Sequence, residues 1–244
     1  MSQDIREEFK RLKSLKVIGE IMRYQRVIPS IMAKSQKQLD EQLSIVKKFA
    51  TTVHIDVVDG KFADNKVFRF PFKLKRGFKY NVHLMVERPE PWIKKHFKKF
   101  QIFFPHIETL KDPMDYFSWM KQSKKPIAFA CLPETKVKDI KSFIPFVDYI
   151  LILTVHPGFY GGKFLKSQIK KIKKIKKLNP DIKIFVDGGI TPKRIEQVSD
   201  FGADFFVSGS YIMDSEEPKE SFKELYHGWA DKRLILRERK HVRR

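Results

Sequence analysis

The stretch Val-His-Ile-Asp-Val-Val-Asp-Gly at residues 53–60 predicts a β-strand, because branched apolar residues predominate in it. Side chains alternate between the two faces of a strand, so His54 and Asp56 share one face while Ile55 and Val57 point to the other. In a barrel, one of these faces is the interior, where a histidine and an aspartate are costly to bury. A metal ion would offset that cost, because imidazole and carboxylate groups are good metal ligands. In this stretch alone, a metal site and a core histidine bonded to its neighbouring aspartate explain the pattern equally well.

Similar β-rich stretches recur along the chain and alternate with amphipathic segments of helical spacing. Strands are predicted at 27–32, 52–58, 80–86, 101–106, 126–131, 147–154, 183–187 and 204–208. Helices are predicted at 36–50, 89–99, 112–124, 137–145, 165–178, 192–201 and 216–226. This alternation is typical of βα units around a parallel sheet, either open and doubly wound or closed. The count of eight strands favours the closed form, an α/β protein with a (β/α)8 TIM barrel.

The chain is expected to form a single domain, because no Gly/Ser-rich linker and no repeat divides it. Residues 26–226 are predicted to form the barrel, within which 61–78 is a loop with at most a short helical turn. Residues 1–25 are predicted to be an extra N-terminal amphipathic helix. The segment 227–244 is a basic C-terminal tail, which either extends the last helix or is loose. The length of 244 residues is near that of a typical single barrel.

Composition limits the environment and the partners of the chain. The formal charge of +21 would attract polyanions, but most lysines are expected on solvated helix faces, as in 165–178. The single cysteine, Cys131, suits a reducing compartment, and no apolar run reaches the roughly 20 residues of a membrane span. The N-terminal segment has charges throughout and no apolar signal-peptide core. These features predict a cytoplasmic protein without a membrane partner, for which nucleic acid is a disfavoured partner.

Two further strands carry polar side chains. His83 and Met85 share a face of one strand, and Asp187 follows an apolar run just before two glycines. Active-site groups of barrel enzymes lie at the carboxyl ends of the strands. His54, Asp56, His83 and Asp187 are therefore predicted to form one site for a divalent metal ion. The ligand set suits zinc, iron, manganese or cobalt and does not choose among them.

Glycines follow the last three predicted strands. They occur at 158–162, at 188–189 and in the Gly209-Ser210 pair. Glycine lets backbone N–H groups approach an anion closely, and barrel enzymes often bind phosphate after strands 7 and 8. Each glycine group alone is also explained by a turn, but together they predict a phosphate site.

Six motifs occur in one order over 27–213, and two more fit the same pattern. The six are Ile28-Pro29-Ser30-Ile31, the stretch 54–60, His83-Leu84-Met85-Val86, residues 154–159, Val186-Asp187-Gly188-Gly189 and Val207-Ser208-Gly209-Ser210; the two are 106–108 and 130–135. In this order and spacing the chain resembles the ribulose-phosphate 3-epimerase family. The resemblance implies the TIM barrel, one divalent metal ion, and interconversion of D-ribulose 5-phosphate with D-xylulose 5-phosphate.

The resemblance also implies roles for particular residues. Asp56 and Asp187 would exchange the roles of base and acid on a phosphorylated ketose. Substrate contacts would come from Ser30, His83, Met85, Gly158, Phe159, Tyr160, Gly161, Gly188, Gly189, Gly209 and Ser210. The family usually has methionine where this chain has Val58, often has methionine at Leu153, and usually has glycine at Tyr160. With all four metal ligands intact, activity is expected, with a changed rate or selectivity.

Two other functions fit parts of the sequence. An epimerase for a hexulose phosphate such as D-allulose 6-phosphate would share the scaffold and the chemistry, and the changed residues at Val58 and Leu153 leave room for it. A non-catalytic barrel that binds RNA or another polyanion would explain the charge, but it would not explain an intact metal set. A homo-oligomer is an open expectation, since the N-terminal helix could either cover a surface or build an interface.

Overall fold

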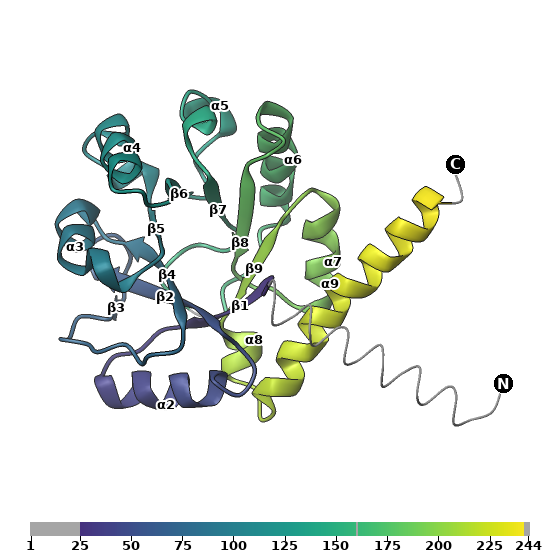
Figure 1. The fold of residues 1–244 in the computed structure, drawn as a ribbon, viewed down its shortest axis with the longest axis horizontal. Helices are drawn as coiled ribbons and strands as arrows, with labels where there is room; N and C mark the ends of the chain where they lie inside the picture. The colour runs from purple at the N-terminus through teal and green to yellow at the C-terminus, as the bar shows by residue number, and fades with distance from the viewer. Residues whose placement is uncertain (1–24, 160, 242–244) are drawn as a thin grey trace.

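A computed structural model describes residues 25–159 and 161–241 of the chain. The helix predicted for residues 1–25 lies outside the described residues apart from its last position. In the described part of the chain, eight parallel strands stand side by side, with helices outside them (Figure 1). The strands are β1 (Val27–Ile31), β2 (Thr52–Asp59), β4 (Lys79–Met85), β5 (Ile102–Pro105), β6 (Ala128–Cys131), β7 (Tyr149–Leu153), β8 (Lys183–Asp187) and β9 (Phe205–Ser208).

The order of the strands confirms the predicted barrel. Neighbouring strands run β5-β4-β2-β1-β9-β8-β7-β6, and a parallel bridge between His106 and Ala130 joins the two ends of this path. One prediction was incomplete, because the segment 61–78 contains a short strand, β3 (Lys66–Val67), that pairs antiparallel with the end of β2. Val67 is buried by this pairing, which a pattern of only two residues does not reveal.

Helices alternate with the strands and cover the outside of the barrel (Figure 1). The α-helices are α2 (Gln36–Val46), α3 (Pro89–His96), α4 (Pro113–Gln122), α5 (Val137–Ile140), α6 (Ile169–Leu178), α7 (Pro192–Asp200), α8 (Ser210–Met213) and α9 (Pro218–His241), and the 3-10 turns are η1 (Phe97–Lys99), η2 (Ile107–Thr109), η3 (Ile144–Phe146) and η4 (Lys166–Gln168). Most predicted helices are shorter than expected. The end of the helix predicted at 89–99 is the 3-10 turn η1, and the start of that predicted at 165–178 is the 3-10 turn η4. Helix α9 continues past residue 226 to His241. No helix in the described ranges has the length and apolarity that crossing a bilayer requires.

The barrel interior changes character along the strands. Its middle is filled by fully buried apolar side chains, among them Ile28, Phe104 and Phe185. Because side chains alternate, the next inward position of β1 after Ile28 is Ser30, and that of β8 after Phe185 is Asp187. The interior therefore becomes polar at the carboxyl ends of the strands, and this change places the candidate site.

Candidate active site

Four side chains from three strands meet at the carboxyl end of the barrel. His54 and Asp56 lie on β2, His83 on β4 and Asp187 on β8, and Asp56 stands beside His83 in the strand register. One potential ligand atom of each residue lies within 4.8 Å of those of the other three. The Nδ1 atom of His83 is 3.4 Å from Asp56 Oδ1 and 3.6 Å from Asp187 Oδ2. The predicted convergence of these four side chains is therefore observed.

The buried atoms of this cluster fit a divalent cation. His54 Nε2, Asp56 Oδ1 and His83 Nδ1 are buried and have no hydrogen-bond partner. Buried polar atoms normally have partners, because leaving them unpaired costs free energy. Two atoms that each bind a tetrahedral ion at about 2.1 Å lie about 3.4 Å apart, and the separations here are 3.4 Å to 3.7 Å. One cation among the four residues would satisfy these atoms, and the donor set does not identify the metal.

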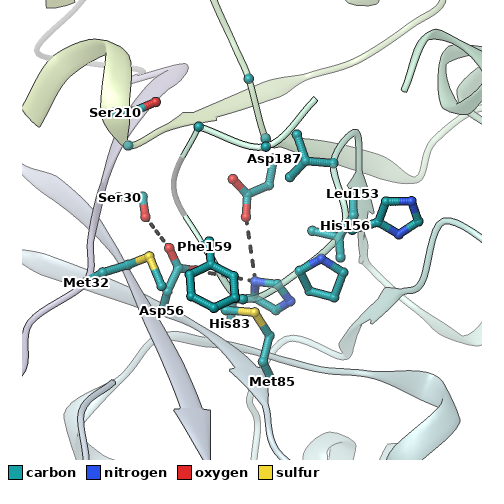
Figure 2. A pocket seen from close by; sticks show the side chains of 18 residues that line it. Ser30, Met32, Asp56, His83, Met85, Leu153, His156, Phe159, Asp187 and Ser210 are labelled. Atoms are coloured by element: carbon teal, nitrogen blue, oxygen red, sulfur yellow. Dashed lines mark hydrogen bonds and ion pairs between the residues drawn. The ribbon is translucent and has the colours of Figure 1, made fainter. Parts of the chain in front are cut away.

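The two carboxylates differ in their electrostatics. Burial alone would raise the pKa of Asp56, but the adjacent imidazole of His83 and the hydroxyl of Ser30 outweigh it and lower the pKa. Burial and the negative charge of Asp56 raise the pKa of Asp187. Ser30 Oγ also donates a hydrogen bond to Asp56 Oδ2 (Figure 2). Neighbouring groups whose pKa values are pushed apart are suited to act as base and acid.

The two histidines also differ. Burial would lower the pKa of His83, but the adjacent carboxylates of Asp187 and Asp56 outweigh it and raise the pKa to about 9. Burial lowers the pKa of His54, whose imidazole packs 5.8 Å from the ring of Phe104. His54 is therefore held as a neutral imidazole, the form that binds metal ions.

A pocket opens directly above the cluster (Figure 2). It is lined by Ser30, Met32, Asp56, His83, Met85, Leu153, Val155, His156, Pro157, Gly158, Phe159, Gly161, Gly162, Asp187, Gly188, Gly189, Gly209 and Ser210. Every residue predicted to contact substrate is among them except Tyr160, which lies outside the described residues. His54 does not line the pocket, because it lies fully buried beneath it.

The pocket wall departs from the sequence prediction at the methionine positions. Leu153 lines the pocket as expected, whereas Val58 does not. Met32, which the sequence analysis missed, lines the pocket together with Met85. Met32 directly follows β1, so its distance from Ser30 along the chain could have marked it as a neighbour of the site.

The glycines of the rim hold backbone conformations that other residues rarely adopt. The φ angles are +114° at Gly158, +76° at Gly161, +108° at Gly188 and +61° at Gly189. A Cβ atom on Gly188 would lie 2.4 Å from the side chain of Val155, which is a severe clash. The chain therefore turns tightly around this side of the pocket only because side chains are absent there.

Fold and site together define a class. An eight-stranded parallel barrel, with a buried cation-binding cluster beneath a pocket at the carboxyl ends of its strands, is the arrangement of a TIM-barrel enzyme. Residues 26–213 match the model of the Ribulose-phosphate 3 epimerase family, and the chain belongs to this family.

Individual relatives agree with this assignment. A ribulose-phosphate 3-epimerase of Helicobacter pylori is 31% identical, over 80% of this chain and 93% of the relative. One of Candida glabrata is 29% identical, over 80% of this chain and 88% of the relative. Among solved structures, a 3-hexulose-6-phosphate synthase is similar with a TM-score of 0.63 at 15% identity, covering 84% of this chain and 100% of that one. At such low identity, the structural likeness shows the fold alone.

Proposed function

We propose that this chain interconverts D-ribulose 5-phosphate and D-xylulose 5-phosphate by inverting the configuration at C3. The family membership and the names of the curated relatives support the substrate. The observation that carries the proposal is the approach of Asp56 and Asp187, from different strands, to the same atom of His83. Two carboxylates at one centre supply the base and the acid that an epimerisation requires.

The reaction takes a proton from C3 and returns one to its opposite face. Because C3 is next to the C2 carbonyl, loss of its proton leaves an enediolate rather than a localised carbanion. Asp56, with its lowered pKa, is suited to accept the proton, and Asp187, with its raised pKa, is suited to deliver one. One forward turnover leaves a proton on Asp56 and takes one from Asp187. The starting state returns either through the reverse reaction, in which the two residues exchange roles, or through proton exchange with water.

The remaining groups hold the reactants in place. A divalent cation bound by His54, Asp56, His83 and Asp187 would supply positive charge beside the substrate oxygens. Ser30 fixes Oδ2 of Asp56 by a hydrogen bond, so Oδ1 stays directed at the two histidines. The glycine-lined rim would receive the phosphate, and Met85 would pack against the sugar.

One assay series tests this function. D-ribulose 5-phosphate is converted with the purified protein as isolated, after treatment with a chelator, and after restoring zinc, iron, manganese or cobalt one at a time. We expect turnover to disappear with the chelator and to return with at least one metal. Absence of turnover with every metal, or faster turnover of D-allulose 6-phosphate than of the pentulose phosphate, would overturn the proposal. The cytoplasmic location and a homo-oligomer stay predictions.

A further inference from the structure

A line of polar contacts leads from the buried cluster to the seam of the barrel. On the side of His83 that faces away from the two aspartates, its Nε2 atom lies 2.9 Å from Nε2 of His106. His106 directly follows β5 and forms the bridge that joins β5 to β6. Its Nδ1 atom lies 3.3 Å from Oε2 of Glu108. The other oxygen of Glu108 accepts hydrogen bonds from the backbone N–H of Leu132, at 3.0 Å, and from the hydroxyl of Thr135.

With a cation on Nδ1 of His83, these contacts allow only one arrangement of protons. A carboxylate can only accept, so His106 must carry a proton on Nδ1 and donate it to Glu108. A cation on Nδ1 of His83 leaves the single proton of that imidazole on Nε2, from which it donates to Nε2 of His106. Nε2 of His106 therefore accepts, and Nδ1 of His83 is the atom that faces Asp56 and Asp187.

The surroundings of His106 keep it neutral. Its side chain is fully buried, and the ring of Phe62 packs 4.4 Å from it. Burial alone would raise the pKa of Glu108, but the hydrogen bonds from His106 and Thr135 outweigh it and lower that pKa. The contacts on both sides of the His106 ring are thus those of a neutral imidazole beside a carboxylate.

We propose that Glu108, acting through His106, is a positioning residue that fixes Nδ1 of His83 as the cation-binding atom and strengthens cation binding at the cluster. The inference deepens the proposed function, since it concerns the cation site of that function. A carboxylate behind a metal-binding imidazole fixes its tautomer and orientation and increases its basicity. Loss of such a partner typically lowers metal affinity about 10-fold to 100-fold.

The decisive variant is Glu108→Gln, which keeps the shape of the side chain and removes its charge. A glutamine that satisfies Leu132 and Thr135 with its oxygen presents its NH2 group to His106. His106 then accepts at Nδ1 and donates from Nε2, so His83 must shift its proton to Nδ1, where it blocks the cation. We expect the zinc affinity of Glu108→Gln, measured by competition with a fluorescent chelator, to fall about 10-fold to 100-fold.

The chain offers a matched control. Glu134 contacts Nδ1 of His156 at 3.2 Å in a second carboxylate–imidazole pair, which is largely exposed and touches none of the four cluster residues. We expect Glu134→Gln to leave zinc affinity within about twofold of the unchanged protein, because exposed pairs contribute little. An equal loss in both variants would overturn the proposal, since it would show a general effect of lost negative charge.

Two further measurements separate positioning from folding. In zinc-loaded protein, the NMR chemical shifts of the His83 ring nitrogens should show zinc on Nδ1 in the unchanged chain. In Glu108→Gln they should show a smaller fraction of molecules with zinc on Nδ1. If that variant fails to fold, Thr135→Val removes one hydrogen bond to Glu108, and we expect it to lower zinc affinity by a smaller factor. Unchanged affinity in a folded variant would overturn the positioning role. Absent turnover of D-ribulose 5-phosphate by the unchanged protein would instead overturn the proposed function alone.

Discussion

The two sides of the pocket depend on different parts of the chain, one on side chains and the other on backbone. The metal corner, formed by His54, Asp56, His83 and Asp187, consists of buried side chains on regular strands. The glycine rim is formed by Gly158, Gly161, Gly188, Gly189 and Gly209 with Ser210, and the backbone of its first four glycines has positive φ angles that side chains disfavour. The corner therefore tolerates few changes of side-chain chemistry, and the rim tolerates few additions of volume. Under the proposed function, changes in the corner should act on kcat and on the metal, and changes in the rim should act on KM.

The largest effect is expected in the corner. Asp187→Asn keeps the shape of the side chain but removes the acid and base function and a metal ligand. We expect kcat to fall by about 10³-fold or more, while the circular dichroism spectrum and thermal midpoint stay close to those of the unchanged chain. Kinetics with D-ribulose 5-phosphate measure the first quantity. A variant that still epimerises at a near-normal rate would refute the two-aspartate mechanism.

The rim is tested by adding one methyl group. Gly188→Ala places a Cβ atom 2.4 Å from Val155 at a φ of +108°, so the backbone must move. We expect KM for the ketose phosphate to rise about tenfold, equivalent to about 1.4 kcal/mol, with a smaller change in kcat. Steady-state kinetics with each variant measure both constants.

The matched control for this variant is Gly77→Ala. Gly77 has a similar φ of +93°, but nothing lies within 4 Å of the added atom. It should lose about 1–3 kcal/mol of stability through backbone strain and keep its KM. If KM rose equally in both variants, the effect would be general strain, and the distinction between corner and rim would fail at this position.

The four corner residues were predictable from sequence because strand alternation alone decides which side chains share a face. Predicting that His54 shares a face with Asp56, and Phe185 with Asp187, required only correct strand positions. Met32 was missed although it lies two residues after Ser30, and Val155 was missed because it follows its strand, where this period no longer applies. Side-chain contacts between distant segments could not be predicted from the sequence either, because they depend on closure of the barrel.

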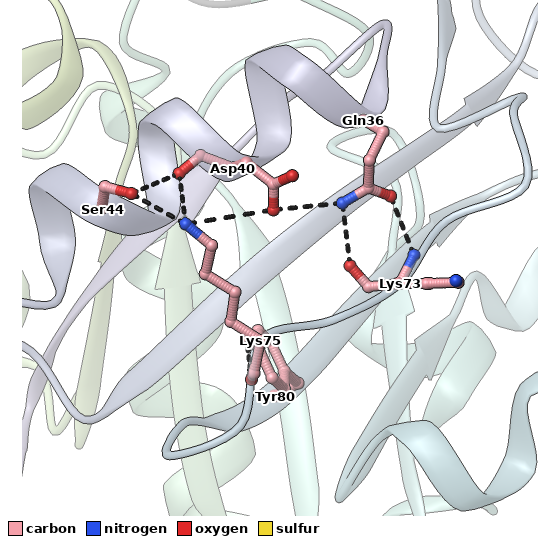
Figure 3. Close-up of polar contacts among 6 residues, drawn as sticks. All are labelled: Gln36, Asp40, Ser44, Lys73, Lys75 and Tyr80. Atoms are coloured by element: carbon pink, nitrogen blue, oxygen red, sulfur yellow. Dashed lines mark hydrogen bonds and ion pairs between the residues drawn. The ribbon is translucent and has the colours of Figure 1, made fainter.

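The loop between β3 and β4 illustrates such contacts. Gln36 on α2 exchanges two hydrogen bonds with the backbone of Lys73, at 2.9 Å and 3.0 Å (Figure 3). The ammonium group of Lys75 donates to the Asp40 carbonyl and to the hydroxyl of Ser44. No sequence period links these residues, so the prediction of a loop at 61–78 named no partner for it. Its attachment to α2 is a result of the structure alone.

A smaller effect is expected at the outer edge of the rim. Arg194 donates a hydrogen bond from Nη1 to the carbonyl of Gly189 at 2.6 Å, and its guanidinium group lies over the ring of Phe164 at 4.6 Å. Loss of one such hydrogen bond costs about 1 kcal/mol, so Arg194→Ala should raise KM roughly fivefold with kcat unchanged. Arg194→Lys keeps the charge but loses the planar stack. We expect it to behave like the alanine variant, and full recovery of KM in steady-state kinetics would show that charge, rather than loop position, matters.

The smallest effect is expected at a histidine outside both regions. It measures how much of the loss of stability in acid comes from this residue rather than from the pocket. Burial, followed by the charges of Lys99 and Lys95, lowers the pKa of His96 to about 4 from its ordinary 6.5. Its ring packs against Phe72 at 4.9 Å and Trp92 at 4.5 Å. Between pH 6.5 and pH 4 the unfolded chain binds more protons at His96 than the folded chain, so stability should fall as the pH falls through this window.

His96→Asn should be less stable at pH 7 but lose less stability on acidification, as read from urea midpoints at pH 7 and pH 5. If both proteins lost the same stability between pH 7 and pH 5, groups other than His96 would cause the loss. The titratable residues of the metal corner would then be tested first.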